Sequence, residues 1–158
     1  MKKAVVLGTP VLIGYFALAV PQALQPLKAS TGLWQMTETL SLTGLPPELA
    51  AMMGSGRTHN YTTCVTPEDL RSNPWAEGSN EKCKWTVVSS SATDMEVKGA
   101  ECSTGMNGMT AEVHGKIHLT DTKSGTGSFD ISMSVSGQTL MGHASYTGKW
   151  SGATCPAE

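Results

Sequence analysis

Cysteines are the residues of this chain whose chemistry is easiest to predict. No Cys-x-x-Cys pair occurs, and the long intervals between the cysteines do not match the spacing of zinc ligands. An even number of cysteines predicts two disulfide bonds in a chain that folds in an oxidising compartment. Three pairings are open, and closeness in the sequence together with closure of the C-terminal tail favours Cys64–Cys83 with Cys102–Cys155.

Glu38 is the carboxylate with the most unusual position, because it falls on the apolar face of a predicted strand, between Met36 and Leu40. Such a residue commonly lies at an open rim or is turned outward by a bulge. A carboxylate that lines a cavity would instead mark a binding or catalytic site. His114 and His118 are four residues apart on a predicted strand, hence about 13 Å apart, which is too far for one metal ion.

No catalytic residue, cofactor or metal ligand can be assigned from the sequence. A Gly-x-Ser-x-Gly motif is absent, so a serine nucleophile would have to meet its base through the fold. Methionines could bind Cu(I). However, several of them fall on apolar strand faces, where methionine usually fills a core: Met36, Met95, Met109 and Met133.

Large apolar side chains could line a ligand cavity if the strands form a curved sheet. Small residues on the same faces, such as Gly115, Gly142, Ala144 and Gly148, would leave room for a ligand. The alternative is that all these side chains form an ordinary core. The candidate lining residues are Trp34, Glu38, Trp85, Met133 and Trp150.

Alternation of apolar and polar residues predicts the strands that must position these side chains. One apolar and one polar face is typical of antiparallel sheets. The predicted fold is all-β with minor α content: a curved antiparallel meander of about seven strands that forms a half-barrel, a barrel or a sandwich, with one or two short helices. The predicted strands cover residues 33–42, 57–65, 83–89, 93–102, 109–119, 128–135 and 140–150.

Local signals add one hairpin and two short helices. With Gly137-Gln138 as the central turn residues, Val135 faces Leu140 and Phe129 faces Tyr146. Residues 46–53 are compatible with two helical turns. The segment that begins at Thr66-Pro67 resembles a helix N-terminus.

The N-terminus has the layout of an export signal. Lys2 and Lys3 precede an uncharged apolar run over residues 4–20. This pattern predicts a signal peptide over residues 1–29, cut somewhere between 19 and 29, and a single disulfide-bonded β domain over residues 30–158. The run is short for a membrane span. We therefore expect a periplasmic protein with no stable membrane span after cleavage, with an uncleaved inner-membrane anchor as the alternative.

Charge offers no sign of a polyanionic partner. The chain has 11 Lys and Arg against 13 Asp and Glu, for a net charge of −2, and the basic residues form no stripe. Nucleic acid is therefore a poor candidate partner.

Two motifs in this setting resemble a known group. Gly32-Leu33-Trp34 opens a predicted strand behind the leader. Residues 64–69, Cys-Val-Thr-Pro-Glu-Asp, are then followed by three further cysteines, the last near the C-terminus. This pattern resembles the secreted proteobacterial family catalogued as "domain of unknown function" number 3617, over nearly the whole mature chain. The resemblance implies a small periplasmic protein and supplies no activity or catalytic residues.

The function expected from the sequence is non-enzymatic binding of an apolar small molecule or of an envelope protein. The alternative is a periplasmic enzyme whose residues converge only in the fold. Copper handling through methionines is a weaker alternative.

Overall fold

Strands dominate the computed structural model, which describes residues 24–45, 47–52, 55–75, 83–103, 110–135 and 138–156. The helical elements are a short α-helix, α1 (Pro47–Met52), and a 3₁₀ turn, η1 (Asp69–Arg71). Every predicted strand is present. The first predicted short helix is found as α1, whereas the segment that begins at Thr66 forms only the 3₁₀ turn η1. The strands are β1 (Gly32–Thr43), β2 (Thr58–Val65), β3 (Lys84–Ser90), β4 (Asp94–Ser103), β5 (Thr110–Asp121), β6 (Ser124–Val135) and β7 (Gln138–Gly152).

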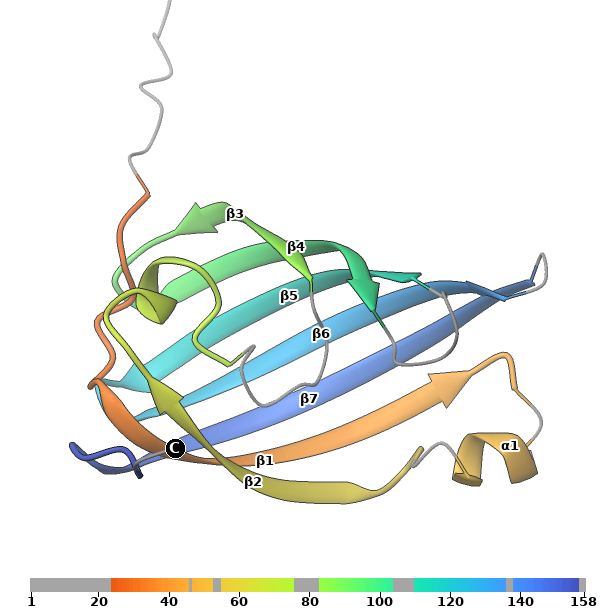
Figure 1. Cartoon of the computed structure of the whole chain (residues 1–158), viewed down its shortest axis with the longest axis horizontal. Coiled ribbons are helices and arrows are strands. Elements are labelled where there is room, and N and C mark those ends of the chain that lie inside the picture. Colours follow the sequence, from red (N-terminus) through yellow and green to blue (C-terminus); the bar gives the residue numbers. More distant parts are fainter. Residues whose placement is uncertain are drawn as a thin grey trace, which may run out of the picture.

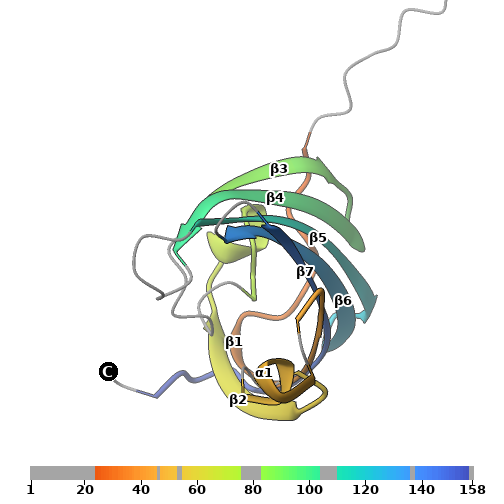
Figure 2. The same ribbon diagram turned by 90° about the vertical axis from the view of Figure 1, so that its right-hand side faces the viewer.

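All seven strands form one antiparallel sheet in the order β2-β1-β7-β6-β5-β4-β3 (Figure 1). Strands β3 to β7 follow one another as a meander, whereas β1 lies between β2 and β7. The sheet does not close, because its two edge strands, β2 and β3, do not pair with each other. Figure 2 shows the strands as an open arc, so the fold is the half-barrel among the three predicted forms.

The inner face of the arc carries the core. Along β5 the buried side chains alternate strictly with outward-facing ones, as expected for a strand with one solvated face. Two segments cover part of the inner face, residues 24–31 and residues 66–75, and they place Leu27, Leu70 and Trp75 in the core. A hydrogen bond joins the two segments: the backbone N–H of Leu27 donates to the carbonyl oxygen of Leu70 at 3.0 Å. Figure 2 shows η1 inside the arc.

Local chemistry explains how residues 66–75 enter the arc. The backbone N–H of Thr66 donates to the Asp69 carboxylate at 2.7 Å, and the Asp69 N–H donates to the Thr66 hydroxyl at 3.3 Å. This reciprocal pair fixes the start of η1. Further on, the Trp75 ring lies directly over Gly127, where a Cβ would be 2.5 Å from it. Only glycine at that position lets the indole reach the sheet.

The disulfides are Cys64–Cys155 and Cys83–Cys102, so the predicted pairing was wrong. Closeness in the sequence misled because β1 separates β2 from β7. Leu33 at the start of β1 is opposite both Cys64 and Gly152, so the tail beyond β7 passes close to Cys64. Cys83 precedes β3 and meets Cys102 in the adjacent β4, as hairpin neighbours do.

The predicted register of the last hairpin was also wrong, by two residues. Val135 is opposite Gln138, Met133 is opposite Leu140 and Phe129 is opposite Ala144. Residues 136 and 137, which join the strands, lie outside the described ranges. A shift of two leaves every side chain on its predicted face, because the side-chain period of a strand is two. Alternation alone therefore could not distinguish the two registers.

Residues 24–31 belong to the folded domain, although most of the predicted leader, residues 1–23, lies outside the described part. Backbone N–H groups of Lys28 and Ser30 donate to Ala92 and Thr122 at 2.8 and 2.7 Å. Leu27 is 2% exposed. Cleavage after Ala19 or Ala23 would keep these contacts, whereas cleavage after Ala29 would remove Leu27 from the core. Over the ranges described, none of the helices has the length and apolar character that a bilayer crossing needs.

Candidate functional site

Three of the five candidate lining residues have structural roles. Trp34 and Met133 are 1% and 7% exposed and belong to the core. Trp150, opposite Trp34 in register, is half-buried at the end of β7. Its indole N–H donates to Thr31 O at 2.9 Å, and Lys123 Nζ lies 4.5 Å from its ring centroid. Glu38 and Trp85 remain as candidates for a site.

The small residues of the inner face do not leave an empty cavity beside them. A Cβ at Gly115 would lie 2.3 Å from the Phe129 ring, and one at Gly148 would lie 3.0 Å from Met36 Sδ. Ala144 is fully buried. Core side chains fill this space, so any binding surface must lie elsewhere on the inner face.

Toward the α1 end of the sheet, Met133 and Leu140 are buried, but several other apolar inner-face side chains are only half-buried. Leu42 and Ile131 approach each other over Gly142. A Cβ added at Gly142 would lie 3.1 Å from Leu42 Cδ2 and 3.5 Å from Ile131 Cβ. Trp85 lies in the same row of cross-strand partners and contacts Phe129 edge-on, with ring centroids 6.3 Å apart. We refer to these residues as the apolar patch: Leu40, Leu42, Trp85, Val87 and Ile131.

Glu38 lies on the same inner face, next to the apolar patch along β1. It is opposite His59 of β2 and Tyr146 of β7. The Tyr146 hydroxyl donates to Glu38 Oε1 at 2.8 Å. Tyr146 also meets Phe129 edge-on, with ring centroids 5.1 Å apart. The carboxylate is therefore held where the aromatic core meets the half-buried patch.

Tyr61 completes the surroundings of Glu38. Burial of its side chain, and then the negative charge of Glu38, raise the pKa of the Tyr61 hydroxyl well above its usual value. The Tyr61 ring also stacks on the ring of His59, with centroids 5.9 Å apart. Sequence reasoning singled out Glu38 but not its two tyrosines. Alternation did place Tyr146 on the apolar face, which was the available signal.

Glu38 forms no ion pair with any described residue. The ion pairs within the described ranges join Lys84 with Glu101, His114 with Glu96, His118 with Asp94, and His143 with Asp130. A carboxylate on a core-forming face usually has a cationic partner. Glu38 instead has the Tyr146 hydroxyl.

Histidine–carboxylate pairs gather on the outer face. Nitrogen–oxygen distances are 2.6 Å for His114 with Glu96, 2.7 Å for His118 with Asp94, and 2.8 Å for His143 with Asp130. Shallow hollows of about 410 and 460 Å³ adjoin these pairs. The part of the chain that is described holds no group of three His, Cys, Asp or Glu side chains arranged to bind a metal ion.

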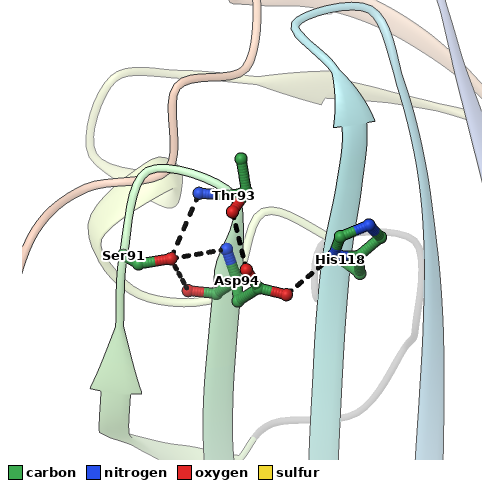
Figure 3. Close-up of polar contacts among 4 residues, drawn as sticks. All are labelled: Ser91, Thr93, Asp94 and His118. Atoms are coloured by element: carbon green, nitrogen blue, oxygen red, sulfur yellow. Dashed lines mark hydrogen bonds and ion pairs between the residues drawn. The ribbon is translucent and has the colours of Figure 1, made fainter.

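Ser91, Asp94 and His118 have the residue types of a serine triad and lie near one another at the β3–β4 turn (Figure 3). Ser91 Oγ accepts from the backbone N–H groups of Thr93 and Asp94, at 3.2 and 2.9 Å. A triad requires the hydroxyl to bond to the imidazole, and Ser91 does not do so. Hydrogen bonds from the Thr93 hydroxyl and from His118 hold the pKa of Asp94 below its usual value. This network stabilises the β3–β4 turn.

The methionines divide between the core and the surface. Met36, Met95 and Met133 are buried among apolar side chains, whereas Met141 is 46% exposed on the outer face. His143, two residues further along β7, is bonded to Asp130 through Nδ1. Met109, like Met106, lies outside the described ranges.

The fold and the site define a disulfide-bonded β half-barrel whose inner face is partly core and partly half-buried apolar surface beside a carboxylate. The chain belongs to the family described as "Protein of unknown function (DUF3617)", whose model matches residues 24–155. The match includes all four cysteines and all seven strands. No curated protein and no solved structure matches the chain.

Proposed function

We propose that this protein is an exported, non-enzymatic binding protein, and that its apolar patch holds the hydrocarbon part of a small molecule. The observation that carries the proposal is the contrast within one face of the sheet. The half under residues 24–31 and 66–75 holds buried side chains such as Trp34, Met36 and Ile117. The half toward α1 leaves Leu40, Leu42 and Ile131 half-buried, beside the buried Met133 and Leu140.

The arrangement of the patch suits an elongated apolar group. Its side chains come from β1, β3 and β6. In the row that joins Leu42 to Trp85, β7 and β4 contribute Gly142 and Gly99, and β5 contributes the buried Val113. Contiguous apolar surface that remains exposed on a soluble domain often marks a binding site. A ligand seated there would contact Trp85, which offers a fluorescent reporter.

Decanol, a neutral ten-carbon alcohol, should bind the oxidised protein saturably at about one equivalent and shift its tryptophan fluorescence. The variant Ile131→Lys should weaken this binding by at least about tenfold, because a charged side chain would enter the apolar patch. Met141→Lys is the matched control, since it adds the same charge on the outer face and should leave the affinity unchanged.

The location of the signal should be checked with Trp85→Phe, which should remove most of the fluorescence shift while calorimetry still detects binding. Circular dichroism of each variant establishes that the fold is retained. A wild-type protein that takes up no decanol, or an Ile131→Lys variant that binds as well as wild type, would contradict the proposal.

Two disulfides without a free cysteine in the described ranges support folding in an oxidising compartment outside the cytoplasm. Cells that express the full chain with a C-terminal tag should release a shortened protein from the periplasm on osmotic shock. Its N-terminal residue, read by mass spectrometry, should lie between residues 20 and 30. Recovery of the uncut chain in the membrane pellet would instead support the anchored alternative.

A further inference from the structure

We propose that the bound molecule carries a protonated amine, which Glu38 holds between Tyr61 and Tyr146 while the hydrocarbon part lies on the apolar patch. This inference rests on the proposed function and names its ligand class: an alkylammonium amphiphile.

Charge complementarity is the first argument. Glu38 faces inward between Met36 and Leu40, yet no cationic side chain of the described residues pairs with it. One oxygen of the Glu38 carboxylate accepts a hydrogen bond from the Tyr146 hydroxyl. A carboxylate keeps several acceptor sites beyond one such bond, and it prefers a charged donor near an apolar surface. A ligand ammonium would supply that donor.

Aromatic surroundings are the second argument. A cation gains from contact with aromatic faces within about 6 Å, and tyrosines beside a carboxylate are a common setting for ammonium recognition. Tyr61 and Tyr146 both lie beside Glu38, from strands on either side of β1. Tyrosine hydroxyls are neutral at neutral pH, and burial of Tyr61 raises its pKa further, so Glu38 supplies the negative charge among these three residues.

The relative position of head and chain is the third argument. Glu38, Leu40 and Leu42 point to the same face of β1, because side chains alternate along a strand. The distance from Glu38 to Leu42 is about 13 Å by strand rise, which a medium-length alkyl chain spans. The polar head and the apolar body of one molecule could thus be held together. A fatty acid would be disfavoured, because its carboxylate would be repelled by Glu38.

Three ten-carbon probes, compared by calorimetry below their micelle-forming concentrations, test the inference on the oxidised protein. Decylammonium should bind about tenfold more tightly than decanol, and decanoate should bind more weakly than both. In Glu38→Gln, which retains an acceptor for Tyr146, decylammonium and decanol should bind equally and the decanol affinity should be unchanged.

Glu112→Gln is the matched control, because Glu112 is an exposed carboxylate on the outer face of β5. It should keep the wild-type preference, which excludes general attraction of a cation to an acidic protein. Equal binding of decylammonium and decanol by wild type would overturn the amine assignment and leave the proposed function standing. A preference that survives Glu38→Gln would also overturn it. Failure of all three probes would overturn both proposals.

Discussion

Replacing Cys64 and Cys155 together by serine should lower the free energy of unfolding by about 4.6 kcal/mol, the larger of the two disulfide effects. The chain-entropy model gives this value for a separation of 91 residues. For Cys83 and Cys102, separated by 19 residues, the same model gives about 3.2 kcal/mol. Either loss is large beside the typical 5 to 15 kcal/mol stability of a domain.

Urea unfolding of the two double variants and of the oxidised wild-type protein measures these costs directly. Peptide mapping under non-reducing conditions should recover Cys64 linked to Cys155, and it fixes the pairing independently of stability. A smaller loss for the Cys64/Cys155 variant than for the Cys83/Cys102 variant would contradict the entropic account. A Cys64–Cys83 peptide would contradict the structure itself.

Trp34→Ala should be the most damaging single core substitution among the tryptophans of the sheet, with a loss of about 3 to 5 kcal/mol. The Trp34 side chain is 1% exposed and packs near Gly148 and Met36. Its indole N–H donates to Ser30 O at 2.8 Å, so the substitution also leaves a carbonyl without its partner. The cavity cannot be filled easily, because residues 24–31 cover it.

Trp150→Ala is the matched comparison, because Trp150 lies opposite Trp34 but is only half-buried. Its loss should be clearly smaller, since less apolar surface returns to water. Thermal and urea unfolding of both variants, with intact disulfides established first, gives the two values. A greater loss at Trp150 would mean that Trp34 is not part of a continuous core and would reopen its assignment as a ligand-lining residue.

Strand positions were predictable because each strand has one wet and one dry face, so alternation is written along its length. The order of the strands in the sheet was not predictable in this way. The pairing of β1 with β7 joins residues such as Trp34 and Trp150 that are far apart in the sequence. No local pattern contains that information. The error in the disulfide pairing has the same origin, since Cys64 and Cys155 approach each other only because β1 lies between β2 and β7.

The candidate site was predictable only in part. Glu38 could be singled out because its inward position depends on β1 alone. Its tyrosines belong to β2 and β7, so they could be recognised as neighbours only once strand order was known. The sequence alone could not distinguish the buried position of Trp34 from the half-buried position of Trp85. Both lie on apolar faces, and what distinguishes them is how far segments such as residues 24–31 cover each.

The place of β1 in the sheet also has a consequence for the order in which the protein can fold. A chain delivered N-terminus first presents β1 early, and β2 follows soon after and can pair with it. The other edge of β1 must wait for β7, the last strand, and contacts so distant in sequence form slowly. Until then an unpaired strand edge is open to incorrect partners. The half-barrel is therefore completed only after the whole chain has been delivered, and Cys155 then secures the final strand to β2.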